Sequence, residues 1–124
     1  MVSSSRVGSE KRLRFRLKTD GDTGELKAGP AGTIETNVWT HVAATWDGET
    51  MQIHKNGAEV GSLAKGGTLS TDSTVKVAIG NQPADTGDRP FDGLIDDVRI
   101  YDQALSQEEI RWLAGRTKPF DKPF

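Results

Sequence analysis

The chain has 124 residues, which is enough for one domain with a modest core. It contains no cysteine, which excludes a disulfide framework, a thiolate nucleophile and a cysteine-bound metal. Its 16 Lys and Arg against 18 Asp and Glu give a formal charge of -2, so the composition predicts neither a nucleic-acid partner nor, without a long apolar run, membrane insertion.

The first predicted elements are an arm and a hairpin. Residues 1–10 are small and polar, and we expect a flexible N-terminal arm or tag remnant. From Lys11 to Lys18, apolar and basic side chains alternate, which is typical of a half-buried strand. The Asp- and Gly-rich stretch 19–24 predicts a chain reversal, followed by a short strand around Glu25 to Ala28.

The middle of the chain predicts three more strands. Val38 to Trp46 has small or apolar residues on both alternating faces, which indicates a central strand covered on both sides. Met51 to Lys55 and Ala58 to Leu63 flank Asn56-Gly57, a strong signal for a two-residue hairpin turn.

The last third predicts two strands and a helix. Val75, Val77 and Ile79 mark one strand, and Phe91 to Tyr101 alternates as the final strand. The helix should begin at a Ser106–Glu109 capping box, with Leu105 against Ile110, and end at Gly115. Residues 117–124 are predicted to be a tail or linker, which leaves 11–116 as the domain.

Strands at hairpin spacing with one terminal helix indicate an all-β antiparallel sandwich or barrel. Three stretches together resemble the laminin-G-like (concanavalin A-like lectin/glucanase) jelly-roll family. They are Asn37–Gly48, Ile53–Gly57 and Phe91–Tyr101 with Ala104–Ser106. The resemblance implies a two-sheet jelly roll, secreted or on the cell surface, that binds a polysaccharide, a glycoprotein glycan or a protein.

The chain departs from this family at its N-terminal side. Family members usually carry several strands before the one matched by Lys11–Lys18, so we expect a truncated jelly roll with exposed edges. Three explanations are open: a fragment, a fold that closes with fewer strands, or completion by another segment or copy. We favour completion by a partner chain, which predicts a homo-oligomer formed through sheet edges.

Asp96 is the candidate metal ligand. In similar sandwiches, an Asp at this place in the last strand helps to hold a structural calcium ion, which prefers oxygen ligands. The alternative is a buried Asp that caps backbone amides or pairs with Arg99. For Asp20, Asp22, Asp85, Asp88 and Asp92, turns and a hydrated surface loop are favoured over calcium ligation.

The basic residues of the first strand are the candidate ligand contacts. Arg12, Arg14, Arg16 and Lys18 share one strand face at spacings of about 7 Å, which suits a sulfated or uronic-acid polysaccharide. The competing interpretation is a solvated face paired with acids such as Glu25.

Two histidines and three tryptophans complete the candidates. Gln52 and His54 share a strand face that could meet sugar hydroxyls, whereas His41 is expected to pack in the core with a backbone hydrogen bond. Trp39, Trp46 and Trp112 have faces that suit sugars, but core packing is favoured for all three.

An enzyme is not expected. The Glu-x-Asp-x-x-Glu run of hydrolases with this fold, a serine-nucleophile elbow and a phosphate loop are all missing from the sequence. Asp96 and Asp97 are adjacent on a strand and therefore point to opposite faces. We expect a non-catalytic carbohydrate-binding or adhesion module, with a protein-interaction or self-assembly module as the alternative and a hydrolase lacking its catalytic part as a weaker third.

Overall fold

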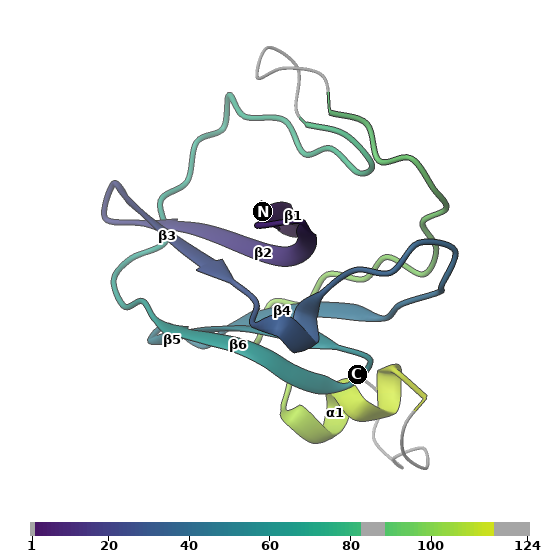
Figure 1. Ribbon diagram of the computed structural model, residues 1–124. Helices are drawn as coiled ribbons and strands as arrows, with labels where there is room; N and C mark the ends of the chain where they lie inside the picture. The colour runs from purple at the N-terminus through teal and green to yellow at the C-terminus, as the bar shows by residue number, and fades with distance from the viewer. Residues whose placement is uncertain (1, 83–88, 116–124) are drawn as a thin grey trace.

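A computed structural model describes residues 2–82 and 89–115, except for the side chains of residues 5–7. The described elements are β1 (Val2–Val7), β2 (Glu10–Thr19), β3 (Asp22–Lys27), the 3-10 turn η1 (Pro30–Gly32), β4 (Val42–Trp46), β5 (Thr50–Lys55), β6 (Ala58–Ala64) and α1 (Gln107–Leu113). Two antiparallel sheets, β1-β2-β3 and β4-β5-β6, lie one above the other (Figure 1). The all-β, two-sheet prediction is confirmed.

The core lies between the two sheets, where β2 contacts β5 and β3 contacts β6. Apolar side chains that alternate along the strands point into this layer, as the period of two requires. Met51 and Ile53 of β5 are each 0% exposed. The buried cluster comprises Leu13, Phe15, Leu26, Ala28, Met51 and Ile53.

The two hairpin predictions are confirmed, and their turns explain why. Asp20 and Gly21 have φ values of 49° and 81°, and Asn56 and Gly57 have 51° and 82°. Left-handed conformations at both turn residues match the twist of the flanking strands. The pairing Arg16↔Glu25 follows from the first turn, and Lys55↔Ala58 follows from the second.

Helix α1 also forms as predicted. Ser106 accepts a hydrogen bond from the Glu109 amide, and the Glu109 carboxylate accepts one from the Ser106 amide. Gly115, with φ 70°, follows the helix. Ile110 is 1% exposed, and α1 lies against the outer side of the β4-β5-β6 sheet (Figure 1).

Three expectations need correction. Val2–Val7, expected to be a flexible arm, pairs with β2 as strand β1. Val38–His41 is not in a strand, and β4 lies at an edge of its sheet rather than at its centre. The strands expected at Val75–Ile79 and Phe91–Tyr101 do not form in the described structure.

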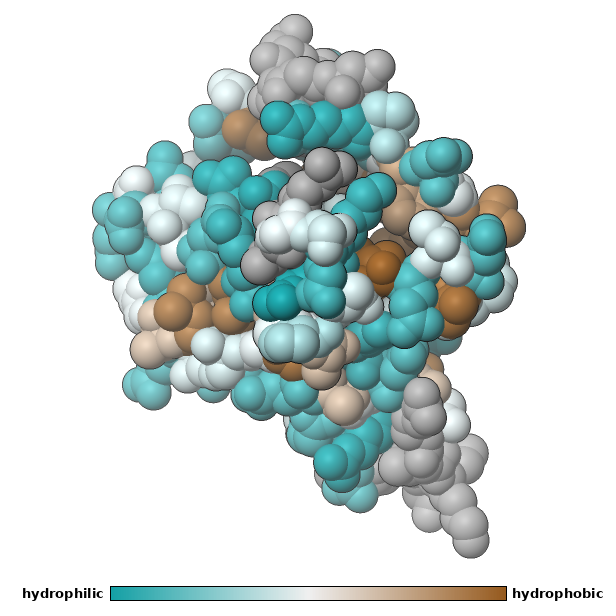
Figure 2. Space-filling model, viewed as in Figure 1, coloured by the Kyte–Doolittle hydropathy of each residue, from teal (hydrophilic) through white to brown (hydrophobic). Residues whose placement is uncertain are grey.

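The cause of the last correction is visible in the surroundings of these segments. Val77 is 86% exposed and Ile100 is 85% exposed, so neither segment has an apolar layer to cover. A strand also needs a neighbouring strand for its backbone groups, and the side-chain pattern alone does not supply one. Hydrophobic side chains accordingly interrupt a mainly hydrophilic surface (Figure 2).

Candidate functional site

The basic residues of β2 lie on the outer face of the first sheet. Inward-facing Leu13 and Phe15 alternate with them, so the core fixes the direction of every basic side chain. Lys27 of β3 stands opposite Arg14 and extends the same face. The described part of this hairpin face carries five cations and two carboxylates: Arg12, Arg14, Arg16, Lys18 and Lys27 with Glu10 and Glu25.

Glu25 lies among these cations. Its carboxylate is 3.1 Å from the Lys27 ammonium and 3.6 Å from the nearest guanidinium nitrogens of Arg14 and Arg16. The Lys27 hydrogen bond, followed by the surrounding positive charge, lowers the pKa of Glu25 below its ordinary value. The cross-hairpin pairing considered for this row is therefore present, and it fixes the spacing of the cations.

The two ends of the row differ in their contacts. Arg12 donates from Nε and Nη2 to Glu10 Oε2 at 3.0 and 2.8 Å, and this contact lowers the pKa of Glu10. Arg14 Nε donates to the Ser3 hydroxyl at 3.1 Å. Arg16 and Lys18 are exposed. Arg12 and Arg14 are thus partly covered and held by neighbouring side chains, whereas Arg16 and Lys18 are exposed, and Arg16 keeps its contact with Glu25.

Gln52 and His54 do not form an open polar surface. Gln52 donates to Glu59 Oε2 at 2.8 Å and accepts from the Thr45 hydroxyl at 3.4 Å. His54 is 1% exposed, with Gln107 of α1 close to its ring. The predicted contact of His54 with a sugar hydroxyl is therefore closed off, since α1 lies against this side of the sheet.

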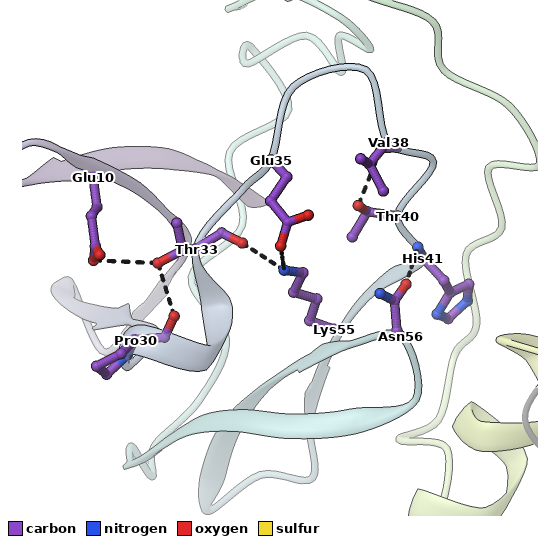
Figure 3. Close-up of polar contacts among 9 residues, drawn as sticks. All are labelled: Glu10, Pro30, Thr33, Glu35, Val38, Thr40, His41, Lys55 and Asn56. Carbon is purple, nitrogen blue, oxygen red and sulfur yellow. Dashed lines mark hydrogen bonds and ion pairs between the residues drawn. The ribbon is translucent and has the colours of Figure 1, made fainter.

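His41 is only partly buried, outside the buried core cluster, and its hydrogen bonds to Asn56 come from its backbone. Its amide donates to Asn56 Oδ1 at 3.0 Å, and its carbonyl accepts from the Asn56 amide at 2.8 Å (Figure 3). Burial lowers the pKa of His41 and of His54, because a charged imidazole would lose its hydration. The surroundings of both rings therefore favour the neutral imidazole.

The prediction that Trp39, in the loop before His41, packs in the core is wrong. Its side chain is 67% exposed, although its apolar neighbours in the sequence favour burial. Trp46, by contrast, contacts the core and donates from its indole nitrogen to the Lys65 carbonyl at 2.7 Å. Lys55 secures the start of the loop through the Thr33 carbonyl at 2.7 Å and Glu35 at 3.7 Å (Figure 3).

Asp96 is exposed and accepts a hydrogen bond from the Asp97 amide at 2.8 Å. Arg99 pairs with Asp97 at 2.8 Å, rather than with Asp96. Within residues 2–82 and 89–115, no three His, Asp or Glu side chains gather closely enough to hold a metal ion. Calcium at Asp96 therefore stays a prediction.

The other acidic candidates fall into two groups. Asp20 accepts from the Thr68 amide at 3.1 Å and thereby ties the first hairpin turn to a later segment. Asp92 is exposed, while Asp85 and Asp88 lie outside the described residues. None of the helices in the described parts of the chain is long and apolar enough to span a bilayer.

Comparisons with known proteins agree with this architecture. Pappalysin-1 of Mus musculus is 30% identical over an alignment of 117 residues, and the match covers 88% of this chain and 7% of the mouse protein. The crystal structure of an S-layer domain-containing protein (residues 221–444) from Clostridium thermocellum matches with a TM-score of 0.51 and 34% identity. That match covers 86% of this chain and 52% of the other.

The chain therefore spans a small part of the mouse relative and about half of the crystallised bacterial one. Residues 3–111 match the family described as the concanavalin A-like lectin/glucanases superfamily. The matched range includes both sheets and most of α1. The chain belongs to this superfamily.

Proposed function

We propose that this domain is a non-catalytic recognition module of a secreted or surface protein, and that it binds an acidic polysaccharide on the outer face of β2 and β3. The observation that carries the proposal is the row of cations fixed on this face by the buried residues between them. Their excess over the two carboxylates leaves the face positive, although the whole chain has a formal charge of -2.

The geometry suits an extended anionic ligand. Alternate residues of a strand are about 7 Å apart, and guanidinium groups bind sulfate and carboxylate through paired hydrogen bonds. Glu10 and Glu25 compete for the same cations. A ligand must therefore exchange with these internal pairs, which predicts modest affinity and strong dependence on salt.

The proposal of a non-catalytic module agrees with the placement of the acids. Asp96 and Asp97 are exposed on an irregular segment, whereas a glycosidase needs two carboxylates that face each other across a cleft. The bacterial relative is described as S-layer domain-containing, and this motivates the proposed surface location.

Calorimetry with sulfated and uronic-acid oligosaccharides tests the proposal. Arg14→Ala with Arg16→Ala should weaken binding at least about tenfold, because two charge-assisted contacts are lost. Arg111→Ala is the matched control, since it removes an exposed cation from α1. Equal affinity of both variants, or no binding of any acidic glycan by the parent chain, would overturn the proposal.

A self-assembly module is the second candidate. Of the fourteen large hydrophobic residues exposed in the described structure, nine lie between Leu69 and Ile100. Exposed apolar residues concentrated in one stretch are typical of surfaces that associate. This observation is independent of the basic face.

A further inference from the structure

Residues 92–101 have the side-chain pattern of a strand, but they do not form one in the described structure. Leu94, Val98 and Ile100 are 77%, 53% and 85% exposed. Among the described residues, no backbone hydrogen bond connects 92–101 to another segment. Unpaired backbone groups in an extended apolar stretch are a ready template for pairing with another strand.

Asp97 interrupts this stretch in the single chain. Its φ is 52°, and its carboxylate turns back to the Arg99 guanidinium two residues later. The two side chains are 67% and 47% exposed, so the pair is open to exchange with another partner. An Asp tolerates this conformation but does not require it, so the segment can extend when a strand partner is offered.

The segment is complementary to itself when it runs antiparallel. If Val98 faces Val98 of a second copy, Asp97 stands opposite Arg99 of that copy, and Arg99 opposite its Asp97. Ile95 then stands opposite Tyr101. Residues directly opposite in an antiparallel pair share a face, so this register makes two ion pairs and joins Ile95 to Tyr101, while Asp96 stands opposite Ile100.

This register also satisfies two-fold symmetry. In an antiparallel pair related by a two-fold axis between the strands, one residue lies opposite its own counterpart beside the axis, and Val98 takes that position. The contact is used identically by both copies, so it closes as a dimer and does not propagate. The parent chain supplies every group that the interface requires.

We propose that two copies of this chain pair antiparallel through residues 94–100, with Val98 of each copy at the two-fold axis. The interface uses none of the basic residues of β2, so it stands or falls independently of polysaccharide binding. Each Arg99 exchanges the Asp97 of its own chain for that of the partner. The paired segments form the strand that the sequence pattern indicates.

Disulfide trapping tests the position of the axis, because the chain contains no other cysteine. Opposite Cβ atoms in an antiparallel pair are about 4.5–5.5 Å apart, close to the separation that a disulfide spans. Val98→Cys should oxidise almost completely to a covalent dimer. Val77→Cys is the control, since Val77 is 86% exposed and lies outside the segment. Equal yields from both variants would overturn the proposal.

Charge reversal tests the register by analytical ultracentrifugation. Asp97→Lys and Arg99→Glu should each raise the dimer Kd at least about fivefold, because symmetry places like charges opposite each other twice. The double variant restores both pairs and should return to within about twofold of the parent. Both side chains are exposed, and far-UV circular dichroism checks that each variant folds.

Three further outcomes would overturn the proposal: a parent chain that stays monomeric at high concentration, single reversals without effect, or a double variant that fails to recover. A monomer whose residues 94–100 are protected from hydrogen exchange would place the strand partner within the same chain instead.

Discussion

Residues 2–64 and the described residues of 71–101 (71–82 and 89–101) both include alternating apolar side chains, yet only the first region forms sheets. In the first region, each strand has a partner adjacent in sequence, and the inward side chains meet across the layer. In the second, the alternating side chains face solvent. This difference shows that alternation predicts which face of a strand is apolar, whereas the strand forms only where a neighbouring strand pairs with it.

Truncating one apolar side chain in each region should give the largest difference in the free energy of unfolding. Ile53→Ala should lower the free energy of unfolding by about 3 kcal/mol, because Ile53 is 0% exposed and leaves a cavity. Ile79→Ala should change it by less than about 0.5 kcal/mol, since Ile79 is 64% exposed. Urea unfolding measures both. Equal losses would show that residue 79 is packed after all.

The pH dependence of the free energy of unfolding tests the burial of His41 and His54. The pKa values of His41 and His54 are lowered from 6.5 by burial, so as the pH falls the unfolded chain binds protons at a higher pH than the folded chain. Stability should be complete above about pH 6.5 and should fall as the pH drops from there through the folded-state pKa values. One unit of difference between folded and unfolded pKa corresponds to about 1.4 kcal/mol.

The control for this titration is His54→Gln, which removes one titrating group. The groups facing His54 are Glu59, Gln107 and His41, and those acting on His41 are Asp97 and Arg99. Urea unfolding between pH 7 and 5.5 avoids the carboxyl groups, whose ordinary pKa values are 4.5 or less. An unchanged slope in the variant would contradict the buried, neutral assignment of His54.

Helix α1 was predictable because its signals are local. The capping box and Gly115 specify its start and end within ten residues. Ser106→Ala should lower the free energy of unfolding by about 1 kcal/mol, because the Glu109 amide loses its acceptor. Ser62→Ala, at an exposed position of β6, is the control. Equal losses in the two variants would show that the Ser106 cap does not stabilise the protein.

The smallest effect is expected where the sequence prediction fails. Val77→Thr should leave the free energy of unfolding within about 0.5 kcal/mol of the parent, because Val77 is 86% exposed. Thermal or urea unfolding at low protein concentration measures it. A clear destabilisation would mean that Val77 is covered in solution.

The fold could be predicted where neighbours in sequence are also neighbours in space. Both hairpins carry their own turns, and Asn56-Gly57 fixes the β5–β6 connection without help from the rest of the chain. Strand β1 was missed because Val2–Val7 contains three serines and only two apolar residues. Its partner β2, rather than its own composition, makes it a strand.

The candidate site was predictable in part for the same reason. The basic row depends only on the alternation of β2. The burial of His54 depends on α1, which lies about fifty residues later and gives no local signal at His54. Trp39 fails in the opposite direction: its apolar neighbours predict a buried strand, but no strand forms there and the side chain is exposed.

Hydrogen exchange at low protein concentration tests the central contrast most directly, because it reports each backbone amide. The account predicts slow exchange in β2 and β5, the middle strands of the two sheets, and fast exchange throughout 71–79 and 92–100. Strong protection of these two segments in the single chain, or rapid exchange at Leu13, Phe15 and Ile53, would contradict it.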